Sequence, residues 1–302
     1  MTNIRFPFGK SSAACVQNRV DKAIDPVLHI ARPGGATGAV IFAAPHSGRC
    51  YPPGWLRDCR ISAAQLRSVE DAFVDHLFAG VTQYGSPLLR ARFARSFVDV
   101  NRARHDLSLS QRGSSGPESL RARVGLGVIP LAIGADRPIY KAPPPLDVIS
   151  HRLVRYYDAY HAALDELMGA AMAMHGQALL IDCHSMPGEG PMQTKRPDIV
   201  LGDRYGTSCD ISVLRFAAQT LRAMGYRVAV NHPYAGGYIT QRHGRPVEGR
   251  QALQIEISRS LYMNGVTLRK TSGFDALSRN MDIFARAMIG QFGQSAHYVA
   301  AE

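Results

Sequence analysis

Two histidines stand where apolar stretches of the chain end. His46 follows the run TGAVIFAA and Pro45, His184 follows the run ALLIDC, and a small polar residue comes after each histidine. Imidazole nitrogens from two strand ends, joined by one carboxylate, form the ligand set that leaves a zinc ion a position open for water. The pattern therefore favours a catalytic metal site. A hydrogen-bonded structural role is the alternative for each histidine taken alone.

The carboxylate of such a site must come from another segment. A glutamate three residues after His46 would complete the simple H-x-x-E spacing, but position 49 is Arg49. Glu70, Asp71 and Asp75 lie in the next predicted helix, where Asp71 and Asp75 would share one face at a spacing of four residues. We predict Asp71 as the ligand, with Glu70 as the second choice. Solvated helix charges are the alternative for all three.

Two further carboxylates lie within apolar runs. Asp182 precedes His184 by two residues, so on a strand it points the same way and can accept the ring N–H. A cap of the following turn is the alternative. Glu256 lies in ALQIEIS, where burial of a carboxylate is costly unless it is paired or used. Desolvation would raise the pKa of Glu256 toward the range of a general base and acid, with an arginine ion pair as the alternative.

Polar and basic residues suited to a substrate carboxylate occur in two segments. Asn101, Arg102 and Arg104 lie in VDVNRARHD, directly after a predicted strand, and offer a planar bidentate fork. Arg242 and His243 lie in GGYITQRHGRP, after a Gly-Gly pair that permits close approach of the backbone to a ligand. We predict that these five residues bind substrate. Surface salt bridges are the ordinary alternative for each arginine.

Strands and helices alternate around these residues. Strands are predicted at 37–44, 86–93, 95–100, 178–183, 226–230 and 252–257. Helices are predicted at 62–84, 147–175, 210–224 and about 275–292, with Ser62 as the first N-cap and Gly176 past the end of the second. This alternation predicts an α/β fold with a mostly parallel sheet covered by helices on both faces. Ligands of such sheets bind beyond the carboxyl ends of the strands, where both histidines fall.

Composition limits the class of protein. The 302 residues are 46% hydrophobic, which is enough for one large α/β domain. The formal charge of +11 comes mostly from scattered arginines and no nucleic-acid-binding motif is visible, so we expect an anionic small substrate and no nucleic acid. A basic nucleic-acid-binding protein with a degenerate site is the alternative from another class.

Apolar runs and cysteines indicate the expected location. No apolar run approaches the roughly 20 residues of a membrane helix, so no membrane partner is expected. The N-terminal segment MTNIRFPFGKSSAACV is a poor secretory signal, which favours the cytoplasm. Five dispersed cysteines without a C-x-x-C pair argue against a disulfide framework and against a thiolate zinc site.

Seven motifs follow one another between about residues 35 and 263. They are PHSG-x-x-YP at 45–52, ED-x-x-VD at 70–75, VDVNR at 98–102, DCHSMP at 182–187, DIVLGDRYGTSC at 198–209, GGYITQRHGRP at 236–246 and LQIEISRSLYM at 253–263. In this combination the sequence resembles N-formylglutamate amidohydrolases. The resemblance implies a fold like that of zinc carboxypeptidases and aspartoacylases, with a central mixed sheet between helices.

The resemblance also implies an activity and a cofactor. The expected reaction is hydrolysis of N-formyl-L-glutamate to formate and glutamate, late in histidine degradation, with another N-acyl amino acid as the alternative substrate. One catalytic zinc ion is implied, with His46 and His184 as ligands and Glu256 as the catalytic glutamate. Arg102 is our first choice to stabilise the tetrahedral oxyanion. The Gly- and Pro-rich region 108–145 matches no motif, and we expect a surface excursion or lid there that varies with substrate.

Overall fold

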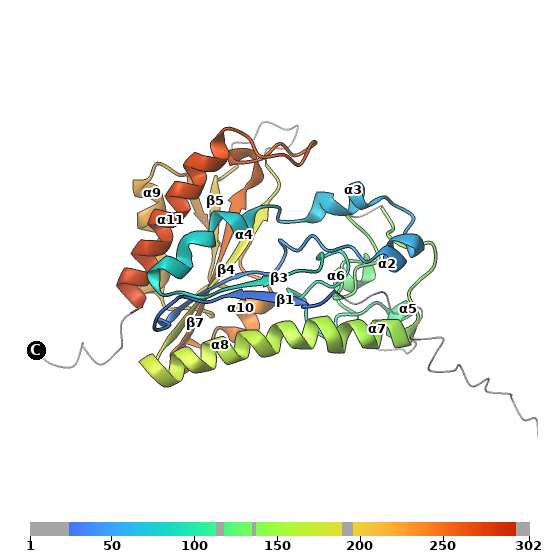
Figure 1. Cartoon of the computed structure of the whole chain (residues 1–302), viewed down its shortest axis with the longest axis horizontal. Coiled ribbons are helices and arrows are strands. Elements are labelled where there is room, and N and C mark those ends of the chain that lie inside the picture. Colours follow the sequence, from blue (N-terminus) through green and yellow to red (C-terminus); the bar gives the residue numbers. More distant parts are fainter. Residues whose placement is uncertain (1–23, 113–117, 135–136, 189–195, 294–302) are drawn as a thin grey trace, which may run out of the picture.

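A seven-stranded sheet forms the centre of the molecule (Figure 1). The computed structural model describes residues 24–112, 118–134, 137–188 and 196–293. The strands, in their order across the sheet, are β1 (Leu28–Ala31), β3 (Leu88–Ala91), β2 (Val40–Ala44), β4 (Ala178–Met186), β7 (Arg250–Ser258), β5 (Ile199–Gly202) and β6 (Val228–Val230). Four of the six neighbouring pairs are parallel, and β1–β3 and β5–β7 are antiparallel. The predicted mixed, mostly parallel sheet is confirmed.

The predicted helices over 147–175, 210–224 and about 275–292 are present. The described helices are α2 (Pro53–Asp58), α3 (Ala63–Leu66), α4 (Val74–Leu77), α5 (Leu109–Arg112), α6 (Leu120–Arg123), α7 (Leu146–Arg152), α8 (Ala159–His175), α9 (Ile211–Ala223), α10 (Tyr238–His243) and α11 (Gly273–Phe292). A π-helical stretch, Leu153–Asp158, joins α7 to α8, so the predicted helix over 147–175 is confirmed. Gly176 ends it in the left-handed conformation, with φ of 70°.

Alternate residues of the strands build two cores, one on each face of the sheet. In β2, Ile41 and Ala43 pack toward α8, while Val40 and Phe42 pack toward α4, α9 and α11. Figure 1 shows α8 along one side of the sheet and the other three helices on the opposite side. Because β2 is buried on both faces, its sequence is a continuous apolar run instead of an alternating one.

The predicted helix over 62–84 is wrong after its first turns. The backbone N–H of Asp71 donates to the carbonyl of His46 at 3.0 Å, and Phe73 adopts a left-handed conformation with φ of 65° before α4 begins. A helix cannot continue through either feature. The break turns Asp71 toward the strand ends, and Asp71 and Asp75 therefore do not share a helical face.

The predicted strand over 95–100 is a turn instead. The backbone N–H groups of Phe97 and Val98 both donate to the carbonyl of Ala94. The backbone N–H of Asp99 then donates to Val128 at 2.8 Å. The apolar residues of this segment are buried as a turn packed into the core, which resembles a short strand in sequence alone.

The described part of region 108–145 has its own structure. It contains α5 and α6, and its residues Val128, Ile129 and Ile139 are fully buried. The region is therefore more than a surface excursion, because it supplies part of the core on the α8 side of the sheet. Residues 113–117 and 135–136 lie outside the described ranges.

Two further expectations from the sequence concern membrane helices and disulfide bonds. Within the described ranges, no helix combines the length and apolarity that crossing a membrane requires. Cys50, Cys59, Cys183 and Cys209 are free thiols, in agreement with the expected lack of a disulfide framework among them. Cys15 and the N-terminal segment examined as a secretory signal lie outside the described residues.

Candidate metal and active site

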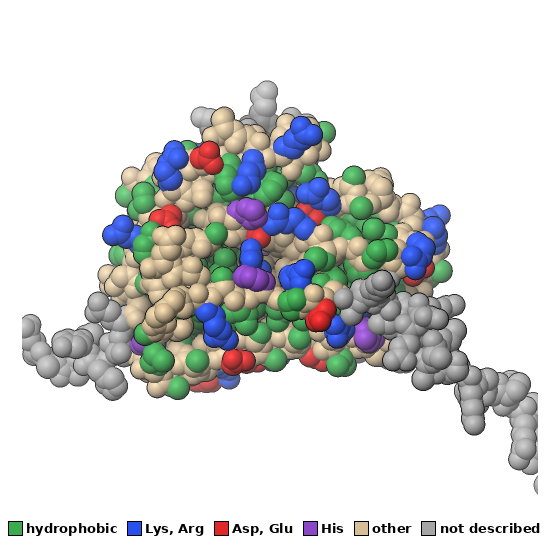
Figure 2. Space-filling model, viewed as in Figure 1, with side chains coloured by type: hydrophobic (Ala, Val, Ile, Leu, Met, Phe, Trp, Pro, Cys, Tyr) green, Lys and Arg blue, Asp and Glu red, His purple; other side chains and the backbone are tan. Residues whose placement is uncertain are grey.

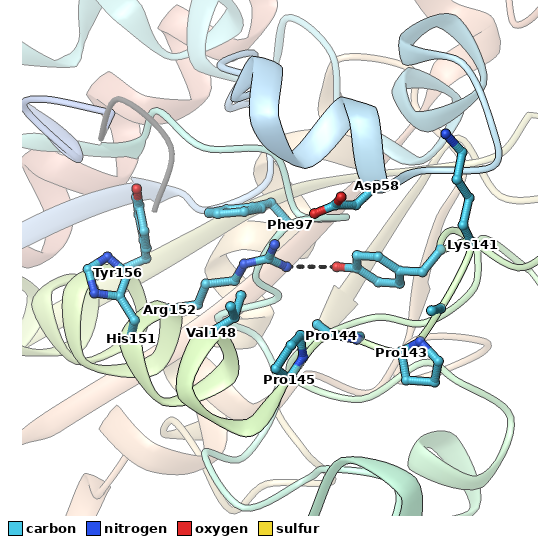
Figure 3. A pocket seen from close by; sticks show the side chains of 12 residues that line it. Asp58, Phe97, Lys141, Pro143, Pro144, Pro145, Val148, His151, Arg152 and Tyr156 are labelled. Carbon is cyan, nitrogen blue, oxygen red and sulfur yellow. Dashed lines mark hydrogen bonds between the residues drawn. The ribbon is translucent and has the colours of Figure 1, made fainter. Parts of the chain in front are cut away.

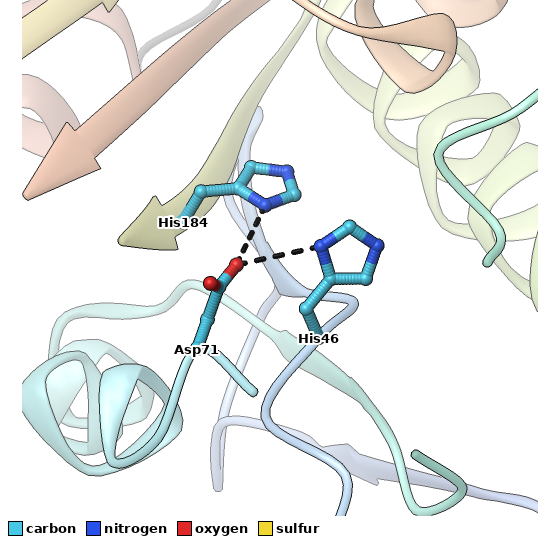
Figure 4. A group of neighbouring side chains, drawn as sticks. All are labelled: His46, Asp71 and His184. Carbon is cyan, nitrogen blue, oxygen red and sulfur yellow. Dashed lines mark hydrogen bonds and ion pairs between the residues drawn. The ribbon is translucent and has the colours of Figure 1, made fainter. Parts of the chain in front are cut away.

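The side chains of His46, Asp71 and His184 meet at the carboxyl ends of β2 and β4 (Figure 4). Their possible ligand atoms all lie within 4.8 Å of one another, and all three residues are buried. Oδ2 of Asp71 lies 3.0 Å from Nδ1 of His184 and 3.4 Å from Nδ1 of His46. His184 lies within β4, which extends further than predicted, and His46 follows β2. These three residues form a group that could hold a metal ion.

Each histidine of this group is oriented by a second carboxylate. Nε2 of His46 lies 2.8 Å from Oδ1 of Asp99, and Nε2 of His184 lies 3.0 Å from Oδ2 of Asp182. For His46, a proton held on Nε2 toward Asp99 leaves the lone pair of Nδ1 directed into the group. Nδ1 of His46 is buried without a hydrogen-bond partner in the described part of the chain, which fits a nitrogen that awaits a cation.

Asp71 presents one oxygen to the histidines and uses the other to hold its position. Oδ1 accepts hydrogen bonds from Oγ of Ser185 at 3.2 Å and from Nη2 of Arg259 at 3.1 Å. Burial alone would raise the pKa of Asp71, but its close contacts with His184 and His46, and the charge of Arg95, hold this pKa well below its usual value. Glu70, the second choice as ligand, instead accepts hydrogen bonds from Tyr51 and Arg67 and lies outside the group.

Glu256 lies beside this group on β7. It stands directly opposite His184 in the parallel register of β4 and β7, so both side chains lie on the same face of the sheet. Burial raises the pKa of Glu256 to about 7, against a lowering effect of His184 and with a further rise from Asp71. Its Oε1 accepts one hydrogen bond from Gln254 at 3.0 Å. A carboxyl group with this pKa can both take up and release a proton near neutral pH.

A cavity of about 740 Å³ opens in front of these residues. Five arginines line it, namely Arg95, Arg102, Arg121, Arg137 and Arg259, together with His46, His184 and Glu256. Figure 2 shows basic and histidine side chains around a hollow near the middle of the face in view. Arg121 and Arg137 come from region 108–145, which therefore contributes to the wall of the cavity. Such a wall favours a small anionic ligand.

Residues 38–263 match the family model for N-formylglutamate amidohydrolase. The chain belongs to this family. N-formylglutamate deformylases of Pseudomonas aeruginosa and Pseudomonas putida are each 26% identical to it, over 74% of this chain and 82% and 81% of theirs. The crystal structure of N-formylglutamate amidohydrolase from Ralstonia eutropha JMP134 matches with a TM-score of 0.81 and 33% identity, over 88% of this chain and 98% of that one. The protein is thus a hydrolase that acts on a carbon–nitrogen amide bond.

Arg95 and Arg102 of this amidohydrolase donate hydrogen bonds to different kinds of partner. Arg95 donates from Nη2 to Oδ2 of Asp99 at 2.9 Å, and its Nη1 lies 4.0 Å from Oδ1 of Asp71. Arg102 donates from Nε to the carbonyl of Leu126 and from Nη1 to that of Asn101. Arg95 therefore lies beside the metal group, as Arg259 does, whereas Arg102 is held against the cavity wall by the backbone.

Asn101 lies between the metal group and the α10 segment. Its Nδ2 is 3.3 Å from Nε2 of His184, and its Oδ1 accepts the backbone N–H of Ile239 at 2.8 Å. A Cβ atom on Gly237 would lie 2.2 Å from Nδ2 of Asn101. The second glycine of the Gly-Gly pair thus permits a close approach of the backbone to Asn101, a cavity residue, while the predicted approach to a ligand stays a prediction.

Three residues predicted to bind substrate lie outside the cavity. Arg104 forms an exposed ion pair with Asp158 at 2.8 Å. Arg242 and His243, both on α10, approach Asp165 at 2.9 and 3.3 Å. The structure therefore does not bring these three side chains to the cavity, and each of them has a carboxylate partner elsewhere.

Three residues of the site were not singled out in the sequence. Asp99 and Arg259 lie within the motifs VDVNR and LQIEISRSLYM, and Arg95 lies three residues before VDVNR. Asp99 contacts His46, and Arg259 contacts Asp71. Arg95 in turn forms an ion pair with Asp99. In the sequence, these residues could have been found because they lie inside or beside motifs that contain predicted site residues.

Proposed function

We propose that the protein is a zinc-dependent deformylase that hydrolyses N-formyl-L-glutamate to formate and L-glutamate, a step late in histidine degradation. The observation that carries the proposal is the buried His46–Asp71–His184 group beside Glu256, at the floor of an arginine-lined cavity. Membership of the amidohydrolase family and the names of the two Pseudomonas relatives support the substrate.

The three residues of the group would hold the zinc ion. Two imidazole nitrogens and one carboxylate oxygen suit zinc and leave a coordination position free for water or substrate. When bound, the ion would supply Lewis-acid polarisation of the formyl carbonyl and would make a water molecule more acidic. Asp99 would keep His46 in the tautomer that binds metal through Nδ1, and the nearby carboxylate of Asp182 would help to orient the ring of His184.

Glu256 would move the proton of the reaction. Its carboxylate takes a proton from the attacking water as the new carbon–oxygen bond forms, and returns it to the amide nitrogen as the carbon–nitrogen bond breaks. The products are then formate and an amine. A pKa of about 7 suits both transfers near neutral pH. The water-derived proton and the departing nitrogen must therefore both come within reach of one carboxyl group.

Arginines would divide the work of charge stabilisation. Arg95 lies beside the metal group and is our choice to stabilise the oxyanion that develops on the formyl carbonyl, in place of the predicted Arg102. Removal of one such donor costs about 3 kcal/mol of transition-state stabilisation. Arg102, with Arg121 and Arg137 on the same wall, would then bind the two carboxylates of the substrate.

The first test measures formate release from N-formyl-L-glutamate together with metal content. We expect about one zinc ion per chain, loss of activity on chelation and recovery when zinc is returned. Glu256→Gln should keep the metal and lose between 10²- and 10⁴-fold in kcat, because it removes the proton carrier alone. Glu248→Gln, an exposed glutamate that faces Arg245, is the matched control and should leave kcat unchanged. A fully active Glu256→Gln enzyme would refute the assigned role.

The second test separates this substrate from other N-acyl amino acids. N-formyl-L-glutamine has the same shape without the side-chain charge, so kcat/KM should fall at least tenfold if an arginine holds that carboxylate. N-acetyl-L-glutamate keeps both charges and enlarges only the acyl group. If the enzyme clearly preferred another acyl group, the assignment of the hydrolytic site would stand, but N-formyl-L-glutamate would be refuted as the substrate.

A further inference from the structure

A second cavity, of about 260 Å³, lies between α7 and the segment that precedes it (Figure 3). No residue that lines it also lines the first cavity. Its floor consists of buried side chains, Phe97, Tyr140, Arg152 and Tyr156, and exposed residues such as Asp58 and Lys141 stand at its mouth. It is thus a separate depression with a polar rim and an aromatic, cationic floor.

The unusual feature of this floor is the guanidinium of Arg152. Arg152 is only 4% exposed, and in the described part of the chain no carboxylate lies within ion-pair distance of it. Its one hydrogen bond there runs from Nη1 to the hydroxyl of Tyr140 at 2.7 Å, the dashed line in Figure 3. An arginine has five N–H donors, and a buried cation ordinarily has an anionic partner. Arg152 therefore has N–H donors that can bind a ligand.

Aromatic rings lie close to this guanidinium, and its remaining N–H groups are available to a ligand. Its central carbon lies 4.1 Å from the centre of the Phe97 ring and about 6 Å from the rings of Trp55 and Tyr140. Such rings stabilise the positive charge without using its N–H groups. A carboxylate in the plane of the guanidinium would accept two hydrogen bonds along its edge, the geometry in which arginine binds anions best.

The remaining wall limits what else such an anion can carry. Phe97, Pro144, Val148 and Tyr156 provide apolar surface for a flat organic body. Asp58 is the one carboxylate among the lining residues of this cavity, and it disfavours a second negative charge on the ligand. Nε2 of His151, another lining residue, is buried without a partner in the described ranges and adds a polar contact point.

We propose that this cavity is a binding site for a small monocarboxylate with an apolar or aromatic body, whose carboxylate pairs with Arg152. The site is distinct from the hydrolytic one, so it holds whether or not the proposed function is correct. Val148 and Arg152 lie four residues apart on α7 and thus face the cavity together. One helix therefore supplies both the charged contact and part of the apolar wall.

Calorimetric titration of the full chain with sodium benzoate tests the proposal. The emission of Trp55, the one tryptophan of the chain, is a second readout, because its ring lies 6.0 Å from the guanidinium carbon of Arg152. We expect benzoate to bind and to change this emission. Benzamide, which lacks the charge, and phthalate, which adds one, should each bind at least tenfold more weakly.

Three variants locate the site. Arg152→Gln should weaken benzoate binding at least tenfold, and Val148→Trp should abolish it by filling the cavity while leaving the charge in place. Arg279→Gln, which removes an exposed arginine of α11, should bind benzoate as the parent does. If Arg152→Gln does not fold, Val148→Trp and the three ligands still decide the question. Equal binding of benzamide, unchanged binding to Val148→Trp or no binding of millimolar benzoate would each overturn the proposal.

Discussion

Two pairs of buried histidines differ in what surrounds their rings. His46 and His184 lie with ring centres 4.8 Å apart, and each meets carboxylates through both ring nitrogens. His161 and His243 are stacked 5.4 Å apart, and a 3.1 Å contact joins Nδ1 of the first to Nε2 of the second. Nε2 of His161 donates to the carbonyl of Val100 at 3.0 Å. The first pair is a group of potential ligands, and the second is a chain of neutral rings.

The pKa values follow from these surroundings. Burial would lower the pKa of His184, but Asp182 and Asp71 raise it well above the usual value. Burial lowers the pKa of His161 to about 4, with Arg242 as the next cause, and that of His243 to about 3, with His161 as the next cause. Burial alone therefore does not mark a histidine as a ligand. The candidate ligand pair differs from the second pair because His46 and His184 share the carboxylate of Asp71 and both line the large cavity, which His161 and His243 do not.

The largest expected effect separates the two pairs by metal content. His184→Ala should reduce bound zinc to a trace and abolish formate release, because one of the three proposed ligands is lost. His161→Gln should retain about one zinc ion per chain, because among the described residues the nitrogens of its ring contact His243 and the backbone carbonyl of Val100, away from the metal group. Atomic emission measurements on the two dialysed variants make the comparison.

Similar zinc loss in both variants, with native circular dichroism, would contradict the division into a ligand pair and a structural pair. Zinc retained in His184→Ala would instead remove this residue from the ligand set and leave the metal held elsewhere.

Much of the site was predictable because its chemistry lies at strand ends. His46, His184 and Glu256 belong to apolar runs whose strand assignment was correct, and parallel strands bring their carboxyl ends together. Asp71 was selected correctly for the group, but from a helix that does not exist at that position. Its position depends on a backbone hydrogen bond to His46, a long-range contact that no local pattern contains.

The misplaced substrate residues have a different cause. Arg242 and His243 follow a Gly-Gly pair that does approach the site, but α10 directs both side chains toward Asp165 on α8. Asp99 was overlooked because its segment resembled a strand, whereas the turn brings it to His46. Helix and turn geometry decide which side of an element faces the cavity, and motif position alone does not.

A second, intermediate effect concerns the pH dependence of stability. Because the folded-state pKa values of His161 and His243 are lowered, the unfolded chain binds more protons than the folded chain below about pH 6.5. Stability from these rings is complete above that pH and is lost as the pH falls toward about 4 for His161 and about 3 for His243. For His161, a pKa lowered from 6.5 to about 4 corresponds to about 3 kcal/mol of stability.

His243→Gln sharpens this prediction, because the glutamine amide can keep the hydrogen bond to Nδ1 of His161 without titrating. Urea unfolding at pH 7, 5 and 4 should show a shallower loss of stability for the variant than for the parent. Carboxylates titrate in the same range in both proteins, so the difference between the two curves is the informative quantity. If stability fell equally with pH in the variant and the parent, the pKa of His243 would not be lowered in the folded protein.

The smallest expected effect concerns Arg242, which lies beside the second pair. Its guanidinium is partly exposed and paired with Asp165 at 2.9 Å, and such surface pairs contribute about 0–1 kcal/mol. Arg242→Gln should therefore leave kcat and KM for N-formyl-L-glutamate within about twofold and change the free energy of unfolding by less than about 1 kcal/mol. Arg102→Gln, on the cavity wall, should raise KM at least tenfold under the same assay. A large rise in KM for Arg242→Gln without a loss of stability would contradict this prediction and would place α10 in the substrate site.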